Sequence, residues 1–530
     1  MLAATLSAAL LVVAARAVMP EGGGSVYFTA PSTYRFVAGA QDPTAAAWGY
    51  YKDMTLATSG FGQLSVSTNG ALPDAAQMFA AGFLEGALTQ ERIYSHTQNA
   101  MAWIESQFKG GAIPANVQAF FVTQDAWARA QVASNNSDHW VAMGGILSQF
   151  DGMVAGYAAT APANQTLSLF QLQSVNAIGD YLDLIVALSP ADAPDYDAMN
   201  DTELMAAVRK NNHCSALVKV NGDLSELYFA HVAWFIFQSM TRIFKHYNFA
   251  LNQAAVAGRQ MSFSSYPAYL SSLDDWYAVW SSGLAVLETT NNVFNKTLYQ
   301  AVAPQSLFAW HRVRLANLLA HSPPEWAAVF SQYNSGTYNN QYPVINVGAF
   351  TPGKALPPDL LWVVEQVPGL VVAGDATELL ALGHFPSYNV PYWRGAFFPS
   401  SQNLSRYPPS HKHTRASPPP TPQRSTTSLA TRSRLRAARP RATAPWASSA
   451  AWTGSWRRAP RSSGATPARW TPWTPSCRSC AATRTRRTPT QRARPGTPSA
   501  AAATWLARPM GAWTARRQWR ACGRARPPLP

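Results

Sequence analysis

The amino-acid composition changes abruptly near Asn403, and this break confines any folded domain to the residues before it. Beyond that point the sequence contains no Phe, Ile or Val and a single Lys, and Arg, Pro, Ala, Ser and Thr dominate. Such a segment cannot build a hydrophobic core, and dense proline prevents helices. We therefore expect residues 405–530 to be a disordered tail. Because Arg, Pro and Ala have GC-rich codons, we interpret this tail as the translation of a GC-rich gene in the wrong reading frame. The alternative is an Arg-rich arm that binds nucleic acid.

The charge of the chain divides at the same place. The whole sequence has 42 basic and 27 acidic residues, a formal net charge of +15, but residues 401–530 hold 25 of the basic residues and no acidic one. The body is therefore acidic, and we expect no nucleic-acid partner. Cys214 is the only cysteine in the body, so no disulfide can form there. The pair Cys477-Arg-Ser-Cys480 has metal-site spacing but no second pair, and we expect neither a metal nor a cofactor.

The N-terminus has the pattern of a secretory signal. Residues 1–18 are almost wholly apolar and end in Ala15-Arg16-Ala17, a small-x-small cleavage site, so we expect a signal peptide at residues 1–17; a signal anchor is the alternative. Glycosylation sequons agree with this interpretation. They lie at Asn135, Asn164, Asn200, Asn295 and Asn403. We expect a secreted protein or one of the lysosomal or vacuolar lumen.

Hydrophobic periodicity predicts a layered α+β domain. One apolar stripe across residues 74–107 predicts helices, whereas residues 215–220 and 227–231 alternate like strands around Asn221-Gly222-Asp223, a tight-turn signal. Residues 234–247 fit a helix, and residues 360–373 form a second strand, turn and strand.

Cys214 lies at the head of the predicted strand, directly after a polar connector. On one interpretation it is a small buried apolar residue. On the other it is a nucleophile, which requires a base because a free thiol is mostly protonated at neutral or acidic pH. Cleavage before Cys214 would supply that base as its own α-amine. The hairpin could also bring His231 beside it, although a histidine at a strand end is more often a packing residue.

Two polar clusters flanked by apolar segments could serve the same site. They are Glu288-Thr-Thr-Asn291 and Asn334-Ser-Gly-Thr-Tyr-Asn-Asn-Gln341. Turns alone could explain both, but side-chain amides and hydroxyls are also the donors that an oxyanion hole requires. The sequence has no phosphate-binding glycine loop, HExxH or GxSxG motif, which argues against nucleotide, zincin and serine-lipase mechanisms.

Long motifs over roughly residues 40–400 resemble the phospholipase B-like family of lysosomal and secreted proteins. They are His213-Cys-Ser-Ala-Leu-Val-Lys219, His231-Val-Ala-Trp234, Met240-Thr-Arg-Ile-Phe-Lys-His-Tyr247, Gly82-Phe-Leu-Glu-Gly-Ala-Leu-Thr89, Ser272-Leu-Asp-Asp275, Leu287-Glu-Thr-Thr-Asn291, the run from Asn334 to Gln341, Glu365-Gln-Val-Pro-Gly369 and Ser387-Tyr-Asn-Val-Pro-Tyr392.

The resemblance implies an N-terminal nucleophile hydrolase with an αββα sandwich, which cuts itself between His213 and Cys214. The fragment 18–213 would stay bound to residues 214–404, and the Cys214 thiolate would attack acyl bonds of phospholipids or related esters and amides. By the same resemblance His231, Thr289, Thr290 and Asn389 belong in the pocket, with Asn389 as the oxyanion donor and His231 in a positioning role. Contact with a membrane surface would be transient.

The chain departs from the family pattern in two places. Ala233 replaces the threonine of a His-x-Thr-Trp motif, and the Arg/Pro tail stands where the family carries further strands and a pocket arginine. We therefore expect a sandwich that is incomplete at its C-terminal end, at a cost of several kcal/mol against a typical stability of roughly 5–15 kcal/mol. The rival functional hypothesis is a catalytically silent glycoprotein that uses the same fold to bind lipid or as a structural module.

Overall fold

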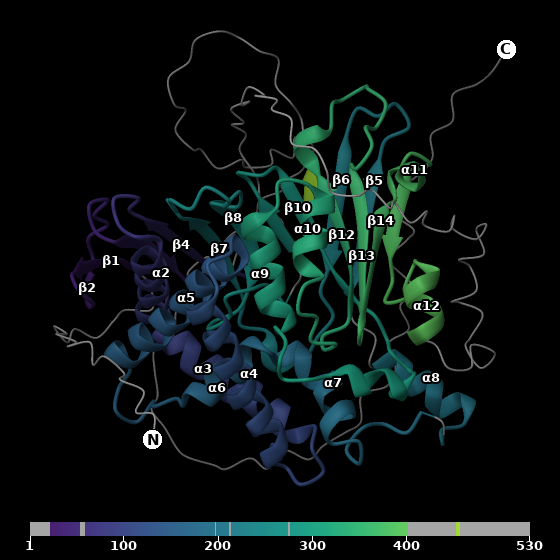
Figure 1. Cartoon of the computed structure of the whole chain (residues 1–530), viewed down its shortest axis with the longest axis horizontal. Coiled ribbons are helices and arrows are strands. Elements are labelled where there is room, and N and C mark those ends of the chain that lie inside the picture. Colours follow the sequence, from purple (N-terminus) through teal and green to yellow (C-terminus); the bar gives the residue numbers. More distant parts are fainter. Residues whose placement is uncertain are drawn as a thin grey trace, which may run out of the picture. The chain divides into compact units, whose positions relative to one another are not determined.

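The computed structural model describes residues 22–53, 59–196, 198–210, 214–273, 276–400 and 452–455. These residues form a mixed α+β structure (Figure 1), which confirms the predicted α+β class. The predicted signal peptide, His213, Asn403, the Cys477–Cys480 pair and the tail other than residues 452–455 lie outside the described residues.

Most strands belong to one large sheet. In sheet order they are β14 (Leu370–Asp375), β13 (Leu361–Val367), β12 (Asn340–Asn346), β10 (Leu284–Leu287), β9 (Trp276–Val279), β8 (Gln260–Ser265), β7 (Ile243–Asn248), β4 (Gly62–Thr68), β3 (Ala47–Lys52), β1 (Gly22–Thr29) and β2 (Thr33–Ala38), with β11 (Thr289–Thr290) beside β12. The pairing is antiparallel except between β4 and β7, whose register runs from Gly62↔Ile243 to Ser67↔Asn248. This parallel pair joins strands from either side of Cys214.

A second, four-stranded sheet contains the predicted hairpin. Its order is β15 (His384–Ser387), β5 (Ser215–Val220), β6 (Leu227–Val232) and β16 (Trp452–Ser455). The hairpin prediction is confirmed, since β5 and β6 pair from Ser215↔Val232 to Val220↔Leu227 around the Asn221 turn. The prediction of a second hairpin near residues 360–373 is also confirmed by the pairing of β13 with β14.

Helices follow the N-terminal strands and recur among the later ones. They are α2 (Asp74–Leu88), α3 (Gln90–Ser106), α4 (Ala115–Ser134), α5 (Asp138–Thr160), α6 (Leu169–Asn176), α7 (Ile178–Leu188), α8 (Asp201–Lys210), α9 (Ala309–Leu319), α10 (Pro323–Phe330), α11 (Thr377–Leu380) and α12 (Arg394–Ser400), with 3-10 turns η1 (Phe237–Ser239), η2 (Lys296–Ala301) and η3 (Val347–Ala349). Helices α2 and α3 confirm the prediction for residues 74–107.

Glycines let α2 and α5 pack with their backbones almost in contact. A Cβ atom on Gly82 would overlap the carbonyl oxygen of Gln149, and one on Gly152 would overlap that of Phe79. Gly86 and Gly156, one turn further on, meet the partner helix in the same way. Small residues four apart on both helices therefore fix the distance of the crossing.

The strands of the large sheet have apolar side chains on both faces and contribute to two cores. Val286 belongs to the core shared with α2, α5, α9 and α10, which cover one face of the sheet (Figure 1). Its neighbours Ala285 and Leu287 point into a second core, where they join Val218 and Phe229 of the small sheet. The layers therefore follow the order helices, large sheet, small sheet.

The predicted helix at residues 234–247 is wrong. The segment contains the short turn η1 and then strand β7, where Ile243, Lys245 and Tyr247 are buried and alternate with half-buried Phe244 and His246. The strand is placed between β4 and β8. Pairing with two neighbours therefore outweighs the local helical pattern.

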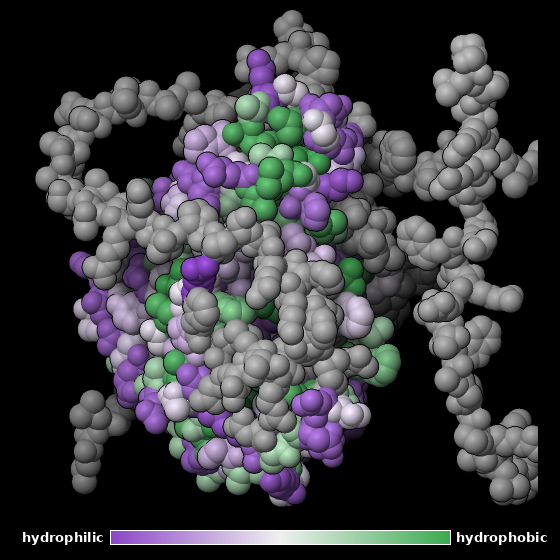
Figure 2. All heavy atoms as spheres, turned by 90° about the vertical axis from the view of Figure 1, so that its right-hand side faces the viewer, coloured by the Kyte–Doolittle hydropathy of each residue, from purple (hydrophilic) through white to green (hydrophobic). Residues whose placement is uncertain are grey.

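Several large apolar side chains remain exposed. Figure 2 shows apolar residues gathered in a patch bordered by hydrophilic ones on the face that carries β14 and α11. Elsewhere, Val232, Trp234, Phe237 and Met240 follow one another along the chain after His231, and Phe237 is 89% exposed. Within the described residues, no helix combines the length and apolar character needed to cross a bilayer.

Candidate functional site

Cys214 directly precedes β5, as the sequence predicted, and its backbone is unusual. It has φ +57°, in the left-handed region that L-residues other than Gly, Asn and Asp seldom occupy. The residue is only 8% exposed. A left-handed conformation costs such a residue about 1–2 kcal/mol, so the residue that follows the predicted cut is strained.

The hairpin brings His231 close to Cys214, which confirms that expectation. His231 pairs with Ala216, two residues from Cys214 on the neighbouring strand. The Cys214 sulfur, a His231 ring nitrogen and a Glu288 carboxylate oxygen all lie within 4.8 Å of one another. Glu288 opens the polar cluster Glu288–Asn291 that the sequence indicated, but the resemblance did not assign it to the pocket. It stands between β10 and β11.

All three members of this cluster are buried, and burial sets the charge of the histidine. His231 is 1% exposed, and removal from water lowers its pKa to about 3, with the positive charge of Arg242 acting in the same direction. The backbone of Glu288 favours the protonated ring but does not outweigh burial. The imidazole is therefore uncharged at neutral and mildly acidic pH.

Thr289, Thr290 and Asn389 also come together. The Asn389 backbone N–H donates to Thr289 Oγ1 at 3.4 Å, and its side-chain amide donates to the Thr290 carbonyl at 2.9 Å. The β15–β5 register ends at Ser387↔Ala216, and its continuation would set Asn389 opposite Cys214. Asn389 also has a positive φ of 64°, which asparagine tolerates.

A buried carboxylate holds the segment that carries Asn389. Glu365 accepts hydrogen bonds from the Tyr392 backbone, from the Trp393 backbone at 2.9 Å and from Gln341 Nε2 at 2.5 Å. Burial raises the pKa of Glu365 to about 7, although these donors favour its charged form. Gln341 Oε1 in turn accepts from Ser387 Oγ at 2.5 Å. Glu365, Gln341 and Ser387 therefore position this edge of the site.

Most of the predicted polar cluster at residues 334–341 forms a turn. Asn334 Oδ1 accepts from the Gly336 backbone at 2.9 Å, and Gly336 has φ +70°. Asn339 donates from its side chain to the Gly336 carbonyl. Of the cluster, Gln341 is the residue that this hydrogen-bond network ties to Ser387 and Glu365.

Comparison with known proteins identifies the family. The family model described as Phospholipase B matches residues 47–435. The chain therefore belongs to the phospholipase B family. It is 39% identical to phospholipase B-like 1 of Rattus norvegicus over 373 residues, covering 69% of this chain and 65% of the relative. Phospholipase-B 81 of Drysdalia coronoides is also 39% identical, over 69% of this chain and 66% of its own.

The similarity extends to relatives of lower identity. Phospholipase B-like protein B of Dictyostelium discoideum is 35% identical over 382 residues, which cover 72% of this chain and 66% of the relative. The matched part thus spans about two thirds of the length of these phospholipase B relatives.

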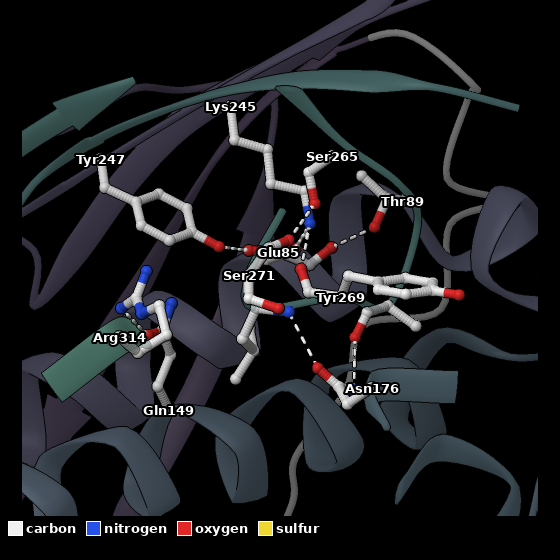
Figure 3. Close-up of polar contacts among 12 residues, drawn as sticks. Glu85, Thr89, Gln149, Asn176, Lys245, Tyr247, Ser265, Tyr269, Ser271 and Arg314 are labelled. Carbon is white, nitrogen blue, oxygen red and sulfur yellow. Dashed lines mark hydrogen bonds and ion pairs between the residues drawn. The ribbon is translucent and has the colours of Figure 1, made fainter. Parts of the chain in front are cut away.

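This phospholipase B family chain also contains a buried ionic cluster away from Cys214 (Figure 3). Lys245 Nζ lies 2.6 Å from Glu85 Oε1, and Tyr247 donates to the other oxygen of Glu85 at 2.5 Å. Arg314, fully buried, donates to Gln149 at 2.9 Å. A neighbouring cavity, lined in part by Tyr269 and Ser271, has room for about one water molecule. We interpret this cluster as structural.

A further buried carboxylate lies at the start of α7. Asp180 accepts a hydrogen bond from Thr337 Oγ1 at 2.5 Å, and burial raises its pKa to about 7. Asp183, on the next turn, accepts from Tyr299, and burial raises its pKa to about 6. Both groups bind protons more tightly in the folded protein than in the unfolded chain.

The predicted glycosylation sites differ in exposure. Asn135, Asn164 and Asn200 are exposed, as a glycosylated asparagine must be. Asn295 is half-buried, and its amide donates to the Pro399 carbonyl at 3.1 Å.

Proposed function

We propose that this protein is a secreted or lumenal hydrolase of acyl bonds in phospholipids or related esters and amides, with Cys214 as an N-terminal nucleophile exposed by self-cleavage. The observation that carries the proposal is the cluster at the head of β5: a strained Cys214 with an imidazole and a carboxylate within 4.8 Å. The relatives named phospholipase B support the substrate class. The same proposal includes an αββα sandwich that is incomplete at its C-terminal end, of which the helices and the two packed sheets would be three layers.

Self-cleavage would begin with attack by the Cys214 thiol on the carbonyl carbon of residue 213. The carbon–sulfur bond forms, the carbon–nitrogen bond breaks, and the thiol proton passes to the departing amine, which leaves a thioester that water hydrolyses. Before the cut no α-amine exists to act as base. Uncharged His231 and the nearby Glu288 are the groups that could accept the proton. Relief of about 1.4 kcal/mol of strain would speed this step about tenfold.

The mature reaction would use the α-amine of Cys214 as its base. The thiolate attacks the acyl carbonyl, the alcohol or amine leaves with a proton, and water then releases the acid from the thioester. Asn389 is the proposed donor to the oxyanion, with Thr289 and Thr290 fixing its orientation through their hydrogen bonds.

The two products of the cut would remain together. The proposed fragments 18–213 and 214–404 meet in the β4–β7 pair and share the core between the helices and the large sheet. Separating them would expose a sheet edge and part of the core to water.

The exposed apolar segment after His231 supports transient contact with a lipid surface. Val232, Trp234, Phe237 and Met240 offer apolar side chains close along the chain to the proposed site. Aromatic residues with one polar and one apolar side suit the membrane–water boundary.

The test is N-terminal sequencing and intact mass of the purified protein, followed by an assay of fatty-acid release from phosphatidylcholine vesicles. We expect a chain that begins Cys214-Ser-Ala-Leu. Cys214→Ala removes both the cut and the release of fatty acid, whereas Cys477→Ser, at a cysteine of the tail, leaves both unchanged.

Two results would count against this proposal. Cleavage that persists in Cys214→Ala would remove the mechanism. A single uncut chain that binds vesicles without releasing fatty acid would favour the rival function, a catalytically silent lipid-binding glycoprotein.

A further inference from the structure

The cluster of Cys214, His231 and Glu288 has the composition of a metal-binding site. Across the part of the chain that the structure describes, it is the group of three His, Cys, Asp or Glu residues whose ligand atoms approach one another closely enough to share an ion. All three residues are buried. Surface carboxylates often cluster without binding metal, but buried groups must compensate for the water they have lost.

His231 is the member whose bonding is incomplete. Neither of its ring nitrogens has a hydrogen-bond partner of normal geometry, although both are shielded from water. Such an orphaned buried polar atom needs a partner, and a bound ion is one of the few that would satisfy it.

The donor set favours a thiophilic divalent cation. Sulfur, imidazole nitrogen and carboxylate oxygen are the ligand types of Zn²⁺, and three protein ligands leave a fourth position open. Around a tetrahedral Zn²⁺ these atoms would lie about 3.5 Å apart. The present separations of up to 4.8 Å therefore need to shorten by about 1 Å, which side-chain rotation can provide.

Charge balance points the same way. A Cys214 thiolate and a Glu288 carboxylate together neutralise a divalent ion, and the thiol proton passes to solvent when the ion binds. The positive charge of Arg242, which acts on His231, opposes the binding of any cation. The bond to sulfur is therefore what favours a thiophilic ion over a hard one.

We propose that Cys214, His231 and Glu288 bind one Zn²⁺-like cation and that this cation holds the nucleophile inactive. Binding depends only on the three side chains. The inhibitory half rests on the proposed function, since the ion occupies the sulfur lone pair that would attack the substrate. After a cut before Cys214, the α-amine lies on the same residue as the sulfur and closes a chelate ring, so the mature chain binds the ion more tightly than the uncut one.

The experiment uses the full chain with Cys477, Cys480 and Cys522 changed to Ser, so that Cys214 is its only thiol. It is titrated with Co²⁺, whose bond to sulfur gives a near-ultraviolet charge-transfer band. We expect one Co²⁺ per chain, displaced by Zn²⁺ and removed by EDTA. Saturating Zn²⁺ should also slow alkylation of Cys214 by iodoacetamide at least about tenfold, as expected for a sulfur held by metal.

Matched variants separate the site from general metal binding. Glu288→Gln and His231→Gln should each weaken Co²⁺ binding about tenfold or more, or at least 1.4 kcal/mol. Glu226→Gln, at the opposite end of the same hairpin, should leave it unchanged. Absence of the band while Cys214 is the only thiol would overturn the proposal. So would a Co²⁺ affinity in Glu288→Gln and His231→Gln that equals the affinity of the parent chain.

Activity in EDTA keeps the two proposals apart. If the protein releases fatty acid in EDTA and added Zn²⁺ abolishes this activity, both the proposed hydrolase function and the metal site are supported. If it releases fatty acid in EDTA but binds no metal, the metal site is refuted and the proposed function stands. Metal binding by a protein that never releases fatty acid keeps the site, removes the inhibitory half and counts against the proposed function.

Discussion

The ion pair between Glu85 and Lys245 allows a quantitative test of the buried cluster, because neither side chain reaches water. Their side chains are 1% and 0% exposed. Removal of one partner leaves the other charged and buried, and the remaining side chain then has to become neutral. At pH 7, deprotonating a lysine of ordinary pKa costs about 5 kcal/mol, and protonating a glutamate of ordinary pKa costs about 4 kcal/mol. We therefore expect Glu85→Gln and Lys245→Met each to lose about 3–5 kcal/mol of unfolding free energy.

The single variants should differ in size and in pH dependence. Glu85→Gln leaves Lys245 near a second buried cation, Arg314, so it should cost more than Lys245→Met. In Glu85→Gln the folded state binds fewer protons than the unfolded chain, and stability rises with pH. In Lys245→Met the remaining carboxyl takes up a proton on folding, so stability falls as pH rises.

The assay is urea unfolding followed by tryptophan fluorescence at two pH values. The double variant Glu85→Gln/Lys245→Met, which removes both charges, should lose no more than the costlier single variant. Additive losses, single losses below about 1 kcal/mol, or pH slopes of the same sign would refute the reasoning, since they would mean that the pair is solvated or uncoupled.

Three further predictions concern other parts of the molecule. Gly82→Ala should lower unfolding free energy by about 3 kcal/mol, because its methyl group meets the Gln149 carbonyl; an unchanged urea midpoint would contradict the tight crossing. Asp180, with its pKa raised to about 7, contributes stability that is complete below the ordinary pKa of 3.8 and is lost as pH rises through about 7. Asp180→Asn should therefore flatten the dependence of unfolding free energy on pH, measured by urea unfolding. An unaltered dependence would mean that Asp180 does not cause it. Phe237→Ser should weaken sedimentation with phosphatidylcholine vesicles, whereas the control Leu382→Ser, at a leucine that is 83% exposed, should not. An equal loss in both variants would mean that the segment after His231 has no special role in vesicle binding.

Local patterns were sufficient to predict the first helices and the hairpin. The turn at Asn221-Gly222-Asp223 and the alternation around it act over a few residues, so the sequence could also predict that His231 returns towards Cys214. Strand β7 could not be predicted in this way, because its apolar residues fit helical and strand periods and the choice depends on β4 and β8.

The polar partnerships were harder to predict, since they join distant segments. The motif around Glu288 was visible, but its approach to Cys214 depends on how the two sheets pack. Likewise Lys245 and Glu85 are separated by 160 residues, and no periodicity links them. Asn389 was expected in the pocket only from family resemblance, and its bonds to Thr289 and Thr290 support a shared location.

The parallel pair of β4 and β7 has a consequence for recovery from unfolding. These strands lie on opposite sides of residue 214, so a cut there turns one polypeptide into two that must meet again by diffusion. Refolding then depends on concentration and competes with aggregation, while the assembled molecule is protected only by the slowness of its opening. Maturation at this bond would make folding a one-way event, completed once in the life of each molecule.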